Sequence, residues 1–393
     1  MAELISIAEG RRRVLEAVRT LDSEPVPVAE ALGRVLAEDV ASPMDVPPFE
    51  STAMDSFAVL AGPAADLEVI DEARAGHPAT RAVEGGTAIR ISTGAAMPPG
   101  ATSVVPVENA RAADGRVWVE ASSEGDHIRR AGEDVERGTV VLTRGTRLGA
   151  AEVGVAAAIG SASLPCARRP RVAVLVTGDE LTEPGEPLPP GGIYSSNGFA
   201  LGGLVERAGA RLVLRATVAD TAEGTRAALS AALDQADLVC VSGGVSVGPH
   251  DHVKPALRQL GVEERFWGVS LRPGKPTWFG THGPVAVFGL PGNPVSAMVT
   301  FRLFARPALD ALVGADAEAG RVTAILDEPL PRHRREQAVR VRLAVAEDGW
   351  HATSTGAQGS HILTSMLGAD ALAMIEAGEG ELPAGARVDI ELL

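Results

Sequence analysis

The chain has 393 residues, with 51 acidic against 36 basic side chains and a formal net charge of −15. Such a charge disfavours nonspecific binding to nucleic acid or to an anionic membrane surface, since both require a basic face. The length predicts two to four domains, and 3% aromatic residues with 44 glycines and 27 prolines indicate β-rich or α/β parts rather than one long helical bundle.

The two cysteines, Cys166 and Cys240, lie far apart beside apolar runs, so neither a disulfide framework nor a CxxC metal or redox site is expected. No uninterrupted apolar run of about 18 residues occurs, and the N-terminal stretch lacks the continuous apolar region of a signal peptide. We therefore expect a soluble cytoplasmic protein that binds neither membrane nor nucleic acid.

The first expected element is an amphipathic helix. In "SIAEGRRRVLEAVRTLD", Ser6 and Glu9 fit a capping box, and apolar residues recur on one helical face. The stretch "AAEVGVAAAIG" indicates a second helix that could pair with the first, and short strands broken by proline and glycine lie between them. The sequence predicts a discontinuous helical linking domain, residues 1–42 with 136–170, around an inserted β-rich domain, residues 43–135.

From residue 171 onward, β-branched runs such as "RVAVLV" alternate with helical segments such as "AEGTRAALSAALDQ". This alternation predicts right-handed βαβ units and a parallel sheet covered on both faces. Strands dominate again after about residue 320. We therefore predict a multidomain α/β plus β fold, with a central doubly wound α/β domain at 171–317 and a C-terminal β-barrel domain at 318–393.

Four loops follow predicted strands and so meet at the carboxyl edge of the sheet, where open α/β sheets bind ligands. They are "TGDE" at 177–180, "AD" ending in Asp220, "SGGVSVGPHD" at 242–251 and "GLPGNP" at 289–294. Glycines in these loops let the backbone approach an anion closely, which indicates a phosphate site. The alternative is that the glycines serve only the geometry of the turns.

Three carboxylates, Glu180, Asp220 and Asp251, are expected at the same edge. They would repel a phosphate unless a divalent cation lay between them, and oxygen ligands of this kind suit Mg²⁺. The alternative is that Asp179 and Asp220 only cap the helices that follow them.

Cationic partners come from "LRPGKPTWFG", in which Arg272 and Lys275 flank a proline and a glycine. These two residues restrict the course of the loop, so both cations could bind one phosphate or other oxyanion. The alternative is that both are solvated surface charges.

The G-x-S-x-G pattern at Gly244 to Gly248 raises a different hypothesis, in which Ser246 is a hydrolase nucleophile. A nucleophile elbow requires the serine directly at the end of a strand, but the predicted strand ends at Val241, and no downstream histidine has the setting of a catalytic base. His250 and His252 lack a third ligand at a known zinc spacing. A serine hydrolase and a histidine metal site are both disfavoured.

The chain also contains, in order, eight motifs that resemble those of the molybdopterin molybdotransferases, the MoeA and gephyrin E-domain family. They are "AMDSFAV", "ISTGAAMPPGA", "IRRAGEDV", "VTGDEL", "SGGVSVG", "RPGKP", "GLPGNPVSA" and "TGAQGSH", and the resemblance extends from about Pro43 to Ser365. Two departures concern charge, because Gly268 and Arg272 stand where some members of the family have lysine.

This resemblance implies an enzyme of molybdenum cofactor synthesis that takes adenylylated molybdopterin and molybdate, leaves molybdenum on the dithiolene and releases AMP, assisted by Mg²⁺. The α/β domain would be the molybdopterin-binding domain. The resemblance also implies a homodimer with its active site between the α/β domain of one subunit and the β-rich insertion of the other. A molybdopterin adenylyltransferase is a candidate partner, and the alternative function is a noncatalytic molybdopterin carrier or scaffold.

The motifs and the loops described above together supply the candidate site residues. The catalytic candidates are Asp55, Thr93, Asp134, Glu180, Asp220, Asp251 and Lys275, of which Glu180, Asp220 and Asp251 are the candidate metal ligands. The substrate-binding candidates are Ser242, Gly243, Gly244, Ser246, Gly248, Arg272, Pro291, Gly292, Pro294, Arg340 and Ser360.

Overall fold

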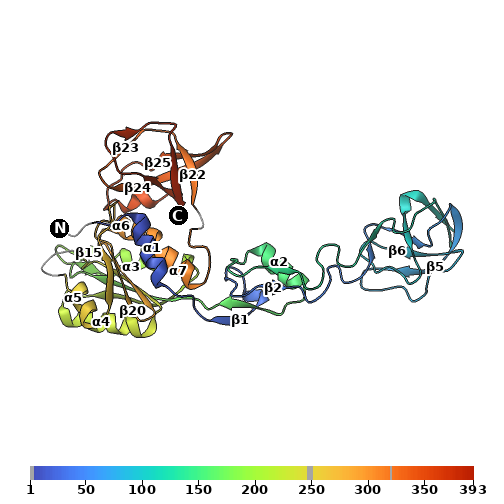
Figure 1. Cartoon of the computed structure of the whole chain (residues 1–393), viewed down its shortest axis with the longest axis horizontal. Helices are drawn as coiled ribbons and strands as arrows, with labels where there is room; N and C mark the ends of the chain where they lie inside the picture. Colours follow the sequence, from blue (N-terminus) through green and yellow to red (C-terminus); the bar gives the residue numbers. More distant parts are fainter. Residues whose placement is uncertain (1–3, 246–250, 319–320) are drawn as a thin grey trace. The chain divides into compact units, whose positions relative to one another are not determined.

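The computed structural model describes residues 4–245, 251–318 and 321–393 of the chain (Figure 1). By their internal contacts the residues form two compact units. The α/β–barrel unit comprises Met1–Glu24, Gly33–Ala37 and Pro165–Leu393, and the β-rich unit comprises Pro25–Leu32 and Glu38–Leu164. Among the described residues, no helix is both long and apolar enough to cross a bilayer.

The α/β part contains a six-stranded sheet in the order β16-β13-β17-β21-β20-β18. The first four strands are parallel, whereas β20 and β18 run antiparallel to their neighbours. The predicted parallel sheet is therefore confirmed for four strands only. The strands β20 and β21 are antiparallel because the link between them is too short to connect parallel strands. The bounds are β13 Arg171–Thr177, β16 Arg211–Val218, β17 Leu238–Ser242, β18 Glu263–Trp267, β20 Trp278–His282 and β21 Val285–Leu290.

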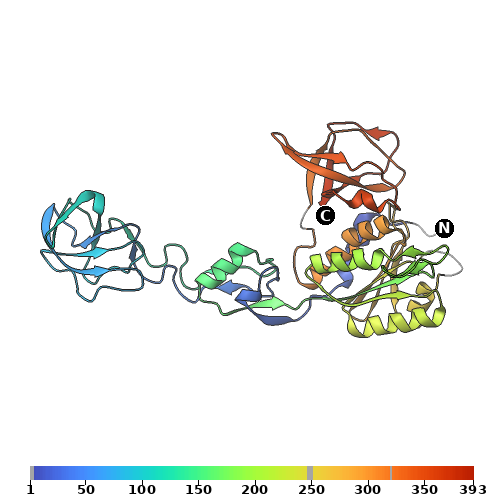
Figure 2. The same ribbon diagram turned by 180° about the vertical axis from the view of Figure 1, so that it is seen from behind.

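Helices cover both faces of this sheet (Figure 1 and Figure 2). Successive side chains of a strand point to opposite faces. In β13, Val174 belongs to the apolar core that includes residues of α1, α3, α6 and α7, while its neighbour Leu175 belongs to the core that includes residues of α4 and α5. The doubly wound arrangement is thus confirmed. The bounds are α1 Ile7–Ala17, α3 Asn197–Arg207, α4 Ala222–Gln235, α5 Val253–Gln259, α6 Pro294–Thr300, the π-helical turn η3 Phe301–Ala305 and α7 Arg306–Leu312.

The N-terminal helix α1 begins where its capping box predicts, because Ser6 Oγ accepts a hydrogen bond from the Glu9 N–H (3.1 Å). Its apolar face, including Ile7 and Val14, is buried in the α/β core. The predicted pairing with the second helix, α2 (Ala150–Ala158), is therefore wrong, since α2 belongs to the β-rich unit. The division into four domains stays a prediction.

The C-terminal part is a barrel, because β24 pairs with both β25 and β26 and closes the ring β24-β25-β22-β28-β26. This confirms the predicted C-terminal β-barrel. A short strand of the α/β part, β19 (Leu271–Arg272), also pairs with β24. The bounds are β22 Arg321–Leu326, β24 Glu336–Ala346, β25 Gly349–Ser354, β26 Ala371–Ile375 and β28 Arg387–Leu392.

The β-rich unit, predicted as an insertion of strands, contains a six-stranded sheet in the order β7-β4-β6-β5-β9-β8. Its bounds are β4 Ser56–Val59, β5 Ala65–Ala73, β6 Thr87–Ile91, β7 Ser103–Pro106, β8 Ala110–Ala113 and β9 Arg116–Val119. The unit also contains two short strand pairs, β2 (Val40–Ala41) with β11 (Val140–Leu142) and β3 (Ser51–Thr52) with β10 (Ile128–Arg129).

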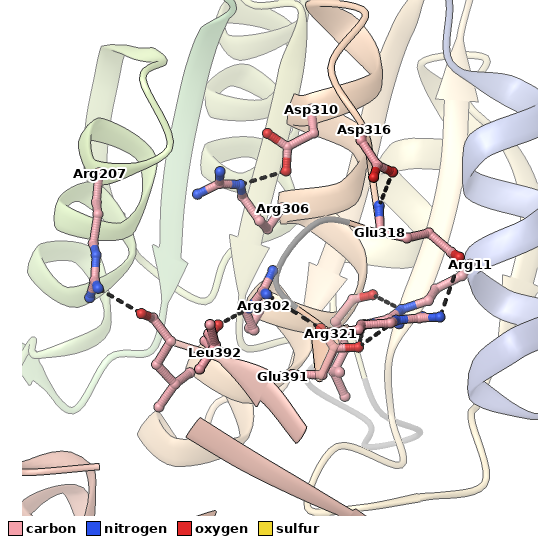
Figure 3. Close-up of polar contacts among 12 residues, drawn as sticks. Arg11, Arg207, Arg302, Arg306, Asp310, Asp316, Glu318, Arg321, Glu391 and Leu392 are labelled. Atoms are coloured by element: carbon pink, nitrogen blue, oxygen red, sulfur yellow. Dashed lines mark hydrogen bonds and ion pairs between the residues drawn. The ribbon is translucent and has the colours of Figure 1, made fainter. Parts of the chain in front are cut away.

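The barrel and the α/β part of the same unit are joined by an ion cluster around Glu391 of β28 (Figure 3). The Glu391 carboxylate meets the guanidinium groups of Arg11 (2.6 Å), Arg302 (3.4 Å) and Arg321 (2.9 Å). Arg11 comes from α1 and Arg302 from η3, and both side chains are mostly buried. One carboxylate of the barrel therefore holds two elements of the α/β part.

Candidate active site

The loops after β13, β16, β17 and β21 line a pocket of ≈ 270 Å³ at the predicted edge of the sheet. We call it the acidic pocket; its lining includes Glu180, Asp220, Asp251, Gly243, Gly244, Pro276, Pro291 and Gly292. Beside it lies a larger pocket of ≈ 590 Å³, the polar pocket, which shares Thr177, Glu180 and Gly292 with the first. Its other lining residues include Tyr194, Ser195, Asn197, Ser242, Asn293, Pro294 and His361.

The two glycines after β17 are required by the backbone. Gly243 (φ 96°) and Gly244 (φ 62°) adopt left-handed conformations that other residues rarely take. A Cβ atom at Gly243 would lie 2.7 Å from Thr177 O, and one at Gly244 would lie 2.7 Å from Val253 Cγ2. Turn geometry alone thus demands these glycines. Ser246 and Gly248 of the same motif lie outside the described residues.

The carboxylates come together as predicted, because Glu180, Asp220 and Asp251 line the same pocket. Asp220 does not cap α4, since Thr221 Oγ1 is the acceptor for the Gly224 N–H (3.2 Å). Asp179 precedes no helix, and its carboxylate accepts a hydrogen bond from the Asp220 N–H (2.9 Å). Burial, and next the charges of Asp179 and Glu180, raise the pKa of Asp220.

These carboxylates suit a hard cation in their chemistry. Within the described residues, no group of three or more His, Cys, Asp or Glu side chains is close enough to enclose a metal ion by itself. Mg²⁺ is usually held by one or two carboxylates together with substrate phosphates and waters. A pocket lined by separate carboxylates therefore fits a Mg²⁺ ion that arrives with a phosphate.

The predicted cations lie on the loop that leads to the acidic pocket. Arg272 and Lys275 are exposed, and Pro276 next to Lys275 lines the pocket. A barrel segment that was not predicted to contribute to the site meets this loop, where Arg335 Nη1 donates to Leu271 O (2.8 Å). Burial, and next the positive charges of Arg272, Arg335 and Arg334, lower the pKa of His333. The run "RHRR" at residues 332–335 is the sequence feature that indicates this additional positive charge.

Gly268, one of the two departures from the motifs of the resembling family, is explained by its backbone conformation and its close neighbours. Gly268 adopts φ 88°, and a Cβ atom there would lie 2.8 Å from Leu4 Cδ2. Its N–H donates to Thr277 O (2.8 Å), and its carbonyl accepts from the Ile5 N–H (3.3 Å). Gly268 thus has a positive φ and lies against the N-terminal segment, and both features disfavour a side chain at this position.

The polar pocket contains hydroxyl groups in two different states. Ser242 Oγ is fully bonded, accepting from Asn197 Nδ2 (2.8 Å) and donating to Pro291 O (3.0 Å), so it holds the "GLPGNP" loop. Thr177 Oγ1 and Ser195 Oγ are buried without any hydrogen-bond partner among the described residues. An unsatisfied buried hydroxyl is costly, so both groups favour a pocket that receives a polar ligand.

A loop of the barrel reaches the polar pocket, and its residue His361 is part of the pocket lining. Ser360 Oγ accepts a hydrogen bond from Asn293 Nδ2 (3.1 Å). Arg340 is fully buried behind this loop and donates to it, so in this structure it reaches the pocket through the loop. A direct contact of Arg340 with substrate stays a prediction.

The remaining candidates lie in the β-rich unit. Asp55 Oδ1 accepts hydrogen bonds from the Thr93 N–H (2.9 Å) and from Thr93 Oγ1 (3.1 Å). The Thr93 N–H, and next its hydroxyl, lower the pKa of Asp55, so this carboxylate is held in its charged form. Asp134 is exposed, and its N–H donates to Val46 O (3.0 Å).

Comparisons with known proteins cover nearly the whole chain. Residues 5–160 match the MoeA N-terminal region (domain I and II), residues 173–311 a probable molybdopterin binding domain, and residues 323–393 the MoeA C-terminal region (domain IV). A relative from Mycobacterium tuberculosis, molybdopterin molybdenumtransferase 2, is 38% identical over 98% of each chain. The chain belongs to the MoeA family.

Other MoeA relatives agree in sequence and in structure. The molybdopterin molybdenumtransferase of Haemophilus influenzae is 35% identical over 99% of this chain and 98% of its own. A crystal structure of a molybdopterin biosynthesis MoeA protein from Pyrococcus horikoshii superposes with a TM-score of 0.84 at 31% identity, covering 100% of both chains. This MoeA chain therefore has the fold of its family.

Proposed function

We propose that this protein is a molybdopterin molybdenumtransferase, which transfers molybdenum from molybdate to adenylylated molybdopterin and releases AMP. The observation that carries the proposal is the pair of adjoining pockets. One is lined by the carboxylates Glu180, Asp220 and Asp251, and the other by residues that include Thr177 and Ser195, whose buried hydroxyl groups have no hydrogen-bond partner among the described residues. The first suits a phosphate with its metal, and the second suits a polar heterocycle. Full-length relatives named molybdopterin molybdenumtransferase support the same function.

In this mechanism Glu180, Asp220 and Asp251 would hold Mg²⁺, which would offset the charge of the phosphate and polarise the bond that breaks. Lys275 and Arg272 would stabilise the negative charge that develops on the departing AMP. The raised pKa of Asp220 follows mainly from burial, and a bound cation would favour the charged carboxylate again. No covalent bond to the protein is needed.

The direct test is single-turnover release of AMP from adenylylated molybdopterin by the purified protein, with and without molybdate and Mg²⁺. Release that requires both is expected. Tight binding of adenylylated molybdopterin without release would contradict catalysis and indicate the carrier. Release without added metal, in the presence of a chelator, would contradict the role of the carboxylates.

We also propose that the enzyme is a homodimer whose active sites take residues from both subunits, as the family resemblance implies. Asp55→Asn and Asp220→Asn should each be inactive alone. When the two are mixed and their subunits exchange, half of the dimers contain one intact site, so about a quarter of wild-type activity should return. No recovery after exchange, verified with differently tagged subunits, would contradict the shared site.

A further inference from the structure

Trp267 lies at the end of the edge strand β18 and contacts two segments of the acidic pocket. Its indole Nε1–H donates a hydrogen bond to Val245 O (3.1 Å). The ammonium group of Lys254, in the first turn of α5, lies 4.9 Å from the centre of the indole ring. Both contacts are directional, because the N–H meets one carbonyl and a cation prefers the face of an aromatic ring. One side chain therefore holds both the segment after β17 and the start of α5.

A row of paired residues across three strands fixes the position of Trp267. In the sheet register Trp267 of β18 pairs with Trp278 of β20, and Trp278 pairs with Gly289 of β21. Trp278 is buried, and its Nε1–H donates to the Glu264 carboxylate (2.7 Å). Val245 is buried against Gly289, since a Cβ atom at Gly289 would lie 2.6 Å from Val245 Cγ1. The sheet edge is therefore a firm base from which Trp267 reaches Val245.

The start of α5 lies against the glycine turn that precedes Val245. Val253, the first residue of α5, is buried, and a Cβ atom at Gly244 would lie 2.7 Å from Val253 Cγ2. Val245 and Val253 belong to one apolar core, against which Trp267 packs. Asp251 stands two residues before α5 and lines the acidic pocket together with Val245. The position of Asp251 in the pocket therefore depends on where α5 begins relative to Val245.

We propose that Trp267 is a positioning residue of the acidic pocket, which holds Val245 and the start of α5 in fixed relative positions and so sets the place of Asp251. Trp267 is not among the described residues that line the acidic pocket, so it acts through these two segments and not on the substrate. The alternative is that the indole only fills space in the core. The kinetic part of this inference rests on the proposed function, whereas the structural part does not.

The structural part is tested by hydrogen exchange of the unliganded protein. Trp267→Leu removes both contacts and should speed amide exchange in α5, residues 253–260, by about two- to tenfold relative to wild type. Trp267→Phe keeps an aromatic face and Lys254→Met keeps the indole hydrogen bond, so each should have a smaller effect. The strand β13, a neighbour of β17 in the sheet, should stay protected in all three variants. This result does not depend on any activity.

A double-mutant cycle tests whether Trp267 and Lys254 act together. Lys254→Met should add little to the exchange of α5 in Trp267→Leu, because the contact with the ring is already lost. Trp350→Phe is the matched control, since Trp350 is an exposed tryptophan on the barrel strand β25. Equal acceleration of α5 and β13 in the Trp267 variants would mean that the indole only stabilises the whole core, and would overturn the proposal.

The kinetic part is tested by single-turnover AMP release over a range of Mg²⁺ concentrations. Trp267→Phe should raise the Mg²⁺ concentration that gives half-maximal release by about tenfold, because residues that orient a metal ligand affect metal affinity. The rate at saturating Mg²⁺ should change much less, since Trp267 does not touch the substrate. A rate that falls equally at every Mg²⁺ concentration would contradict a role that acts through Asp251.

The two parts can fail independently. If wild type itself releases no AMP, the proposed function fails, and the exchange experiment alone decides whether Trp267 positions α5. If AMP release requires Mg²⁺ but Trp267→Phe alters neither that requirement nor exchange in α5, the positioning role is wrong although the function stands. Should Trp267→Leu fail to fold, Trp267→Phe and Lys254→Met still give the exchange comparison, since each removes only one contact.

Discussion

Asp220→Asn is expected to slow single-turnover AMP release by about 100-fold or more, since it removes one charge at the proposed site of phosphate and metal. The fold should survive, because the substitution keeps the size of the side chain and Asp220 does not cap α4. Circular dichroism and thermal unfolding check the fold, and quenched-flow chromatography of AMP checks the rate. Asp234→Asn, on the exposed side of α4, is the matched control and should be neutral.

The pH dependence gives a second check on Asp220. A carboxylate must be deprotonated to bind a metal, and the pKa of Asp220 is raised mainly by its burial. As the pH falls, Mg²⁺-dependent activity should therefore be lost above the ordinary aspartate pKa of about 3.9. Saturating Mg²⁺ should move this loss to lower pH. An acid limb that neither Mg²⁺ nor Asp220→Asn alters would show that another group controls it.

Glu391→Gln is expected to lower the free energy of unfolding by about 3–5 kcal/mol, because it leaves buried guanidinium groups without a counter-charge. Glu391 is 4% exposed, and Arg11 and Arg302 are mostly buried around it (Figure 3). The desolvation of Arg302 already outweighs its attraction to Glu391, so the pKa of Arg302 is lowered even in the intact cluster. Urea unfolding measures the change in the free energy of unfolding. Calorimetry then tests whether the barrel and the α/β part unfold in separate transitions.

The control for Glu391 comes from the same cluster. Glu318 pairs with Arg321 at 3.0 Å, but its side chain is 61% exposed. Solvated ion pairs contribute about 0–1 kcal/mol, so Glu318→Gln should be nearly neutral. Equal losses for the two variants would mean that the buried cluster does not hold the barrel to the α/β part. A separate low-temperature transition in Glu391→Gln would support that role directly.

The alternation of strands and helices was predictable because hydrophobic periodicity is a property of neighbouring residues. The order of strands along the chain likewise predicted that the loops after β13, β16, β17 and β21 meet at one edge of the sheet, and residues of all four line the acidic pocket. The antiparallel pair of β20 and β21 was not predicted, because β20 was not identified as a strand; the two-residue link at 283–284 is the local signal for this pair. The role of Asp220 was also ambiguous, because both Asp220 and Thr221 can cap a helix and only the structure shows that Thr221 does.

The sequence by itself determined the fold class, the eight ordered motifs and the candidate residues of the carboxyl edge, because each depends on residue types at short spacing. Only the tertiary structure decided that α1 packs on the α/β core, that Arg340 lies behind the Ser360 loop and that Glu391 collects three arginines. Burial and charge pairing depend on residues far apart in the chain, as with Arg11 and Glu391. The free energies of burial and charge pairing depend on how much water packing removes from these groups, and no local sequence pattern indicates that amount.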